Sequence, residues 1–356
     1  MPSPTEKLAN SLKLLQNLQD NDGIAIFKSS ELSRTHRERL QRNGFIKEVI
    51  KGWYISANPA EKKADSTSWF TAYWKFCEKY LNKRFGKNWC LSPEQSLSIH
   101  SGNWTIPKQL LVRSTKGSNN VTSLVFDTSI VDVNLTMPPK KEIVEKDGIR
   151  LFSLAYALVS CTSNFFIKNP IDIRTALTTI TDDSVILAIL LEGGNSTVAG
   201  RIAGAFRNIG RIQIADNIVQ TMKSAGYDIR ETDPFSSKLQ FTITNRDVSP
   251  YGNRIIMMWQ QNREDIIKIF PKSPGIPKNK TTYLQSLEDF YKTDAYHSLS
   301  IEGYKVSPEL IERVMHGQWD PVGNQQDKSH IDAMAARGYY LAFESVKKSI
   351  EKVFAG

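Results

Sequence analysis

The sequence predicts a multidomain α+β protein: a small N-terminal domain of helices and strands, a mixed α/β middle and an all-α C-terminal segment. Three observations predict it. Helical periodicity and a β-hairpin occur together in residues 1–58, helices and strands alternate over 60–160, and apolar residues recur at helical spacing through most of the rest. A length of 356 residues agrees with two or three domains.

The composition is that of an ordinary globular protein, with 40% hydrophobic and 23% charged residues. No apolar run approaches the roughly 18 residues that a membrane helix needs, and the N-terminus lacks an apolar signal core. We therefore expect a cytoplasmic protein with no membrane partner. The cysteines, Cys77, Cys90 and Cys161, are far apart, and none of the five histidines has a His or Cys at ligand spacing. This favours buried, reduced thiols and no metal site.

The first 58 residues have the element order of a winged helix-turn-helix. Leucines recur at helical spacing near the start, and two short apolar strands flank a tight turn further on. The expected elements are a helix over 8–18, a strand over 24–27, a helix opening at 29–32, a basic helix over 34–42 that ends at Asn43-Gly44, and a hairpin of strands 45–50 and 53–56 with Lys51-Gly52 at its tip.

Positive charge is concentrated in this unit. Residues 28–51 contain seven Lys or Arg and three Glu, a net charge of +4, whereas the whole chain carries +9. Cationic side chains on a short helix can contact phosphates and guanine edges in a major groove. The alternative is a solvated basic helix in a domain that binds protein. The candidate DNA-binding residues are Lys28, Ser33, Arg34, Thr35, Arg37, Arg39, Arg42 and Lys51.

Two short segments of this unit carry a resemblance to a known family. The stretch from Lys28 to Leu32 with the basic helix behind it, and the hairpin segment Lys51-Gly52-Trp53-Tyr54, resemble the N-terminal domain of AbiEi-type antitoxin regulators. The resemblance implies promoter binding. It continues loosely over 60–160, where the family has a domain for regulation and partner contact.

The remaining boundaries follow from composition and spacing. We expect a mostly helical continuation over 161–270, a linker over 271–280 with three prolines and one glycine, and a helical segment over 281–356. Gly200 and Gly204 lie four residues apart on an expected helix, which predicts that another helix packs closely there.

The C-terminal segment contains a short motif at a helix end. Ser298 and Glu302 are four residues apart and share one helix face, and Gly303 follows them. This pattern, with the flanking residues 304–311, is similar to the inhibitory motif of Fic-type protein adenylyltransferases in which the motif precedes the Fic core. The resemblance covers about residues 283–356.

The resemblance implies a role for each motif residue. Glu302 would pair with an arginine of the catalytic motif and block its binding of ATP phosphates, Ser298 would support Glu302, and Gly303 would end the helix. ATP and Mg²⁺ are implied only for a full-length family member that transfers AMP to a protein hydroxyl. We expect this chain to bind no cofactor itself.

The catalytic motif of the family, with its histidine base, glycine-rich loop and arginines, is absent from the sequence. The segment from His316 to Asn324 lacks the phenylalanine, second glycine and arginine. We expect the core after Gly356 or on another chain, and we expect this chain to be inactive alone. The alternative is a DNA-binding repressor or antitoxin of the AbiEi type without enzymatic activity. The sequence leaves homo-oligomer formation open.

Overall fold

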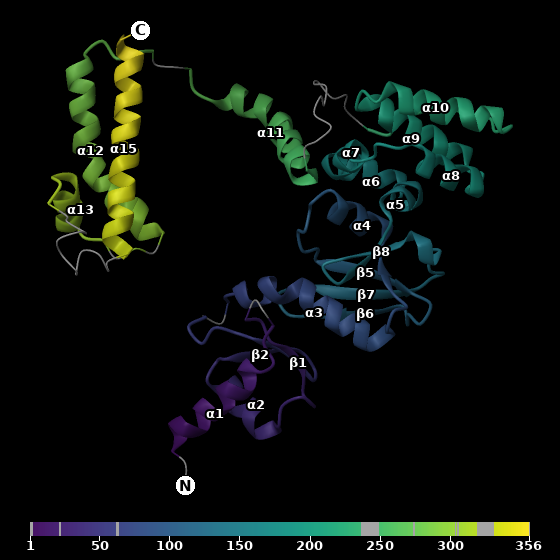
Figure 1. Cartoon of the computed structure of the whole chain (residues 1–356), viewed down its shortest axis with the longest axis horizontal. Coiled ribbons are helices and arrows are strands. Elements are labelled where there is room, and N and C mark those ends of the chain that lie inside the picture. Colours follow the sequence, from purple (N-terminus) through teal and green to yellow (C-terminus); the bar gives the residue numbers. More distant parts are fainter. Residues whose placement is uncertain are drawn as a thin grey trace. The chain divides into compact units, whose positions relative to one another are not determined.

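A computed structural model of the chain confirms the α+β class, because helices and strands both contribute extensively (Figure 1). The structure describes residues 3–20, 23–61, 64–235, 249–272, 275–302, 304, 306–318 and 331–355, with only the backbone described at Glu264 and Ile331. The chain forms two compact units, Met1–Ile267 and Lys268–Gly356, and each is treated by itself.

The first unit opens with a small α+β part made of two helices and a three-stranded sheet. Its sheet is antiparallel in the order β1-β3-β2, and its core contains Leu15, Phe27, Leu40 and Tyr54. Gly44 ends the second helix with φ +77°, and Phe45 N donates to Leu40 O at 2.9 Å. The elements are α1 Pro4–Gln16, β1 Ile26–Lys28, α2 Arg34–Arg42, β2 Ile46–Ile50 and β3 Trp53–Ser56.

The expectation of a helix that opens at residues 29–32 is wrong, because the structure has turns there. The carbonyl oxygens that a helix would use internally accept other donors: Ser29 O and Leu32 O both take hydrogen bonds from the Arg37 guanidinium. The Glu31 carboxylate also accepts a hydrogen bond from Lys28 N at 2.6 Å. Four residues between a strand and the Ser33 cap are too few for a stable helix of their own.

The middle of the first unit holds a four-stranded sheet in the order β4-β5-β7-β6, in which β5 and β7 are parallel. A long aromatic helix, α3, joins this part to the N-terminal sheet, because Trp53 of β3 packs edge-on against Phe76 and Tyr80. The elements are α3 Thr67–Phe85, β4 Cys90–Leu91, α4 Pro93–His100, β5 Gln109–Ser114, β6 Asn120–Ser123, β7 Ser129–Asn134, η1 Lys140–Glu142, β8 Ile143–Lys146 and β9 Ile149–Phe152.

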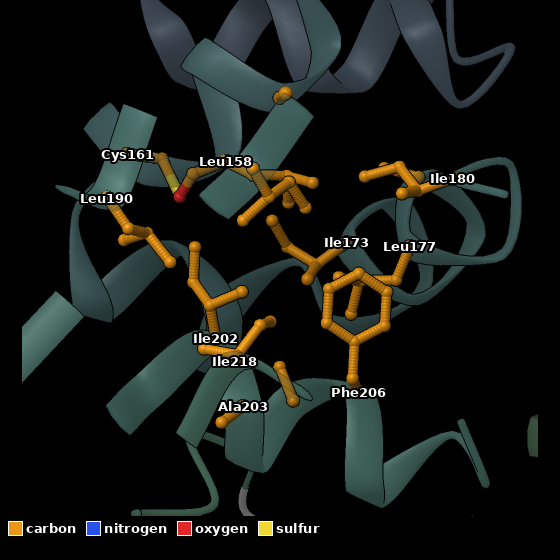
Figure 2. Close-up of a cluster of buried hydrophobic side chains, with 14 of the residues drawn as sticks. Leu158, Cys161, Ile173, Leu177, Ile180, Leu190, Ile202, Ala203, Phe206 and Ile218 are labelled. Atoms are coloured by element: carbon orange, nitrogen blue, oxygen red, sulfur yellow. The ribbon is translucent and has the colours of Figure 1, made fainter. Parts of the chain in front are cut away.

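Six helices then gather around one apolar core. Figure 2 shows Leu158, Ile173, Ile202, Phe206 and Ile218 converging from four of them, and all are fully buried. The helices are α5 Leu154–Ser160, α6 Ser163–Lys168, α7 Pro170–Thr178, α8 Ser184–Gly193, α9 Ser196–Asn208 and α10 Ile212–Ser224.

The expectation of a helix packed on Gly200 and Gly204 is wrong, because a chain segment without helix or strand lies there. A Cβ at Gly200 would stand 2.1 Å from Arg230 O, and one at Gly204 would stand 2.1 Å from Thr232 O. Thr232 N also donates to Gly200 O at 3.2 Å. Because Gly200 and Gly204 have no side chains, the backbone of this segment packs directly against α9, and its distance from the helix is shorter than that between two packed helices.

The second unit is helical over its described residues. Helix α12, Lys280–Ile301, lies alongside α15, Ile331–Ala355, with α13, Pro308–Met315, packed against both (Figure 1). Its core contains Tyr291, Ala295, Leu299, Ile311 and Ala336. Helix α11, Pro250–Ile269, begins in the first unit.

Three further expectations concern chemistry. All three cysteines are buried and free, as expected. Among the described residues, no group of His, Cys, Asp and Glu is placed to hold a metal ion. No helix in the described ranges has both the length and the apolar character to cross a bilayer.

Candidate functional site

The exposed face of α2 is a charged surface of the N-terminal part. Leu40 anchors the helix in the core at 0% exposure. The opposite face presents Arg34, Glu38 and Arg42, which lie one turn apart, with Thr35 beside them. This face therefore contains two arginines and one carboxylate in a row. Lys51 is exposed at the hairpin tip, where Gly52 has φ +81°.

Arg37 and Arg39 turn toward the protein and make internal contacts. Arg37 holds the 29–32 turn and lies over the Tyr54 ring at 5.7 Å. Arg39 donates to Lys7 O at 3.1 Å and to Ser11 Oγ at 2.8 Å, so it joins α2 to α1. Both guanidinium groups position the helix from its inner side.

The other predicted residues of this unit occupy different surroundings. Lys28 Nζ lies 5.5 Å from the centre of the Trp53 ring, in the range of a cation–π contact. Ser33 is exposed at the start of α2, and its side chain makes no capping hydrogen bond. The exposed residues are thus Ser33, Arg34, Thr35, Arg42 and Lys51, whereas the remaining predicted residues are partly or wholly engaged within the fold.

Glu38 is the residue that sequence reasoning did not select. Its Oε1 accepts from Arg34 Nε at 2.6 Å, and this hydrogen bond holds the pKa of the Glu38 carboxyl below its ordinary value. The same bond raises the pKa of Arg34. The signal was available in the spacing, because residues 34 and 38 are four apart on a predicted helix.

The second candidate site is the end of α12 in the second unit. Glu302 is the exposed C-cap residue, and its backbone N donates to Ser298 O at 3.2 Å. Tyr304 N donates to Leu299 O at 3.0 Å, which closes the helix end as in a Schellman motif. Gly303, the predicted terminator, lies outside the described residues.

A tyrosine from α15 fixes the surroundings of Ser298. Tyr339 OH donates to Asp294 Oδ2 at 2.5 Å and lies 3.4 Å from Ser298 Oγ. Ser298 is half-buried there, one turn before Glu302. Sequence reasoning could not find Tyr339, because 41 residues separate it from Ser298.

The Glu302 carboxylate makes no ion pair within the described part of the chain. It also lies at a helix C-terminus, where the helix dipole disfavours negative charge. A cation brought to this position from elsewhere would therefore be attracted by both the carboxylate and the helix end. His316 lies beyond α13 and is exposed, 4.0 Å from Glu312.

The comparisons with known proteins return no relatives. No protein-family model matches the sequence, no curated protein matches it, and no solved structure matches the fold.

Proposed function

We propose that the chain is the regulatory portion of a Fic-type protein AMP-transferase with a DNA-binding N-terminal part, and that it acts in the cytoplasm. Within this proposal the first unit binds DNA through α2 and the β2–β3 hairpin. The end of α12 in the second unit restrains a catalytic core by presenting Glu302 to one of its arginines. The alternative is an AbiEi-type repressor or antitoxin in which the first unit binds DNA and no enzyme is involved.

The observation that carries the DNA proposal is the difference between the two faces of α2: the inner face contacts the protein and the outer face is exposed. Arg37, Arg39 and Leu40 fix the inner face to the turn, to α1 and to the core. The outer face is left free to present Arg34 and Arg42 to a ligand. A helix held this way, beside a hairpin with a cationic tip, suits a major groove and its flanking phosphates.

A binding titration tests the DNA proposal. The purified chain is titrated with duplex DNA from upstream of its own gene over a series of salt concentrations. We expect binding that weakens as salt rises, because bound phosphates release counterions. Replacing Arg34 and Arg42 together by Ala lowers the affinity by about tenfold or more. The control replaces exposed Lys168 and Lys223 by Ala, which removes the same charge elsewhere in the unit. Absence of binding at low salt contradicts the proposal.

The observation that supports the inhibitory role is the placement of Glu302. Its carboxylate is exposed, lies at a helix end that disfavours it, and has no cationic partner among the described residues. An arginine that pairs with it bidentately cannot bind ATP phosphates at the same time. No catalytic role falls to this chain, and ATP and Mg²⁺ belong to the core.

An AMP-transfer assay tests this role. A Fic catalytic core is joined after residue 356 or supplied separately, and labelled ATP and Mg²⁺ are added. We expect low transfer with the wild-type chain and a rise of roughly tenfold or more with Glu302→Gln, because the competing carboxylate is removed. Glu309→Gln removes the same charge from an exposed position on α13 and leaves transfer low. Equal transfer with and without the Glu302 carboxylate contradicts the role, as does transfer by the chain alone.

A further inference from the structure

The exposed row of α2 has a carboxylate at its centre. Glu38 lies one turn from Arg34 and one turn from Arg42, and its side chain is 54% exposed even with Arg34 bound to it. The side chain of Arg34 is 84% exposed. Both groups of the pair therefore remain open to a ligand that approaches this face.

Contacts to phosphates alone do not account for Glu38. A carboxylate on a surface that faces the DNA backbone repels every phosphate and weakens binding to all sequences. In the major groove the bases offer hydrogen-bond donors to an acceptor, namely the amino groups of cytosine and adenine. A carboxylate in this position therefore gains only where it faces such an amino group.

Stabilisation of α2 does not account for the pair either. An acid N-terminal to a base is the favourable order at a spacing of four residues. Glu38 has this order with Arg42, whereas Arg34 and Glu38 have the reverse order. Arg34 begins the helix, where the helix dipole disfavours positive charge, and the first turn contains no acid. The sequence thus places Arg34 against the dipole on an exposed face.

The geometry of the pair leaves a specific set of groups free. Arg34 uses Nε to hold Glu38 Oε1, and its two terminal nitrogens make no hydrogen bond with the described residues, so they offer donors to a ligand. Glu38 Oε2 makes no hydrogen bond with the described residues. Two donors beside one acceptor match the major-groove edge of a G·C pair, where guanine N7 and O6 accept and cytosine N4 donates.

We propose that Arg34 and Glu38 act as one base-recognition pair for G·C. Arg34 donates to guanine, and Glu38 orients Arg34 and accepts from the amino group of cytosine. This inference rests on the proposed DNA binding of the first unit. It makes Glu38 a residue that sets sequence preference, while Arg42 and Lys51 supply attraction to phosphates.

Selection from a randomised duplex library tests the inference. The purified full chain and its variants are incubated with the library at fixed salt, bound DNA is sequenced, and affinities are measured for the selected duplex and for one with A·T at the chosen position. We expect the wild-type chain to prefer G·C at one position by about tenfold or more. Glu38→Gln and Glu38→Ala abolish that preference, and Arg34→Lys weakens it, because Lys lacks the fork of donors.

The control variant is Glu192→Gln. Glu192 lies on α8, and its carboxylate forms another exposed ion pair, 3.8 Å from Lys141 Nζ. This variant is expected to leave the preference unchanged, and thermal unfolding checks that each variant is folded. The inference is overturned if Glu38 variants bind all duplexes more tightly by one common factor and keep the G·C preference, in which case DNA binding itself stands. Failure of the wild-type chain to bind any duplex at low salt overturns both.

Discussion

Two glycines on α9 show how a single missing side chain decides packing. A Cβ at Gly200 or Gly204 meets a carbonyl oxygen of the segment after α10, far inside van der Waals contact. That segment hydrogen-bonds to Gly200 O and is held by Arg207, which pairs with Glu231 at 2.6 Å. The two glycines therefore allow the backbone of this segment to pack directly on α9, which any larger residue would prevent.

Gly200→Ala is expected to destabilise the first unit by about 1–3 kcal/mol, because the new methyl group displaces the segment at Arg230. The sign is informative, since the same change in an open helix stabilises by up to about 1 kcal/mol. Gly193→Ala on α8 is the control, because no atom lies within 4 Å of its Cβ position. Denaturant unfolding of both variants measures the difference. Equal stabilities would show that the segment does not pack on α9.

His100 links the stability of the first unit to pH. Its Nε2 lies 2.8 Å from Phe152 O, and burial lowers its pKa from the ordinary value of 6.5. The folded protein therefore binds this proton less readily than the unfolded chain does. The contribution of His100 is fully present above about pH 6.5 and is lost as the pH falls from there toward the lowered pKa.

We expect the wild-type chain to lose more unfolding free energy than His100→Gln does between about pH 7.5 and pH 5.5. Glutamine keeps an N–H for the Phe152 carbonyl and has no proton to take up. Denaturant titrations of both proteins at each pH measure the two losses. Other titrating groups are common to both proteins and cancel in the comparison. Parallel pH profiles would contradict the assignment.

At the scale of elements, α11 is attached to the first unit through its opening turns. Arg254 donates to Asp172 Oδ1 at 2.8 Å, and the other carboxylate oxygen accepts from Ser98 and Asn103. Asp172 is 3% exposed, so this carboxylate depends on all three partners. Asn253 adds a buried hydrogen bond to Thr178. A polar network therefore holds the opening turns of α11 to the first unit.

Arg254→Met is expected to raise the amide hydrogen exchange of residues 250–257 by about tenfold or more, because it removes the cationic partner of a buried carboxylate. Exchange in α9 and α10 should change little. The matched control is Arg263→Met, an exposed residue on the same helix that contacts the Trp259 ring. If both variants exchange alike at 250–257, the ion pair does not hold the helix.

At the scale of the whole molecule, each compact unit has a core of its own. The core of the second unit centres on Tyr291, which is 2% exposed and lies 4.6 Å from the Phe343 ring centre. Its described members all come from that unit. The cores around Phe206 and around Trp69 belong to the first unit. Separate cores predict separate unfolding.

Tyr291→Ala is expected to destabilise the second unit by about 3–5 kcal/mol through loss of the buried ring. Hydrogen exchange in residues 280–301 should rise while protection of α9 stays unchanged. Tyr291→Phe is the control: its effect should be small, because the Tyr291 hydroxyl is buried with no hydrogen-bond partner among the described residues. Loss of protection in both units after Tyr291→Ala would contradict independent cores.

The sequence by itself determined the features that depend on local spacing. The periodicity of residues 34–42, the Asn43-Gly44 stop and the turn at Gly52 fix α2 and the hairpin, because each needs only neighbouring residues. The same locality explains why Ser298 and Glu302 were recognised as one face of α12. The α+β class follows from the order of such patterns along the chain.

Only the tertiary structure decided which of the charged residues are free. Arg34, Arg37 and Arg39 are alike in sequence, yet Arg37 holds a turn, Arg39 joins two helices, and Arg34 projects with Glu38. A helical pattern gives the angles between side chains around the helix axis, whereas the elements packed around the helix decide which side chains are buried. For the same reason the sequence does not predict the contact of Tyr339 with Ser298 or the packing of backbone against Gly200, since contacts across long sequence separations leave no local pattern.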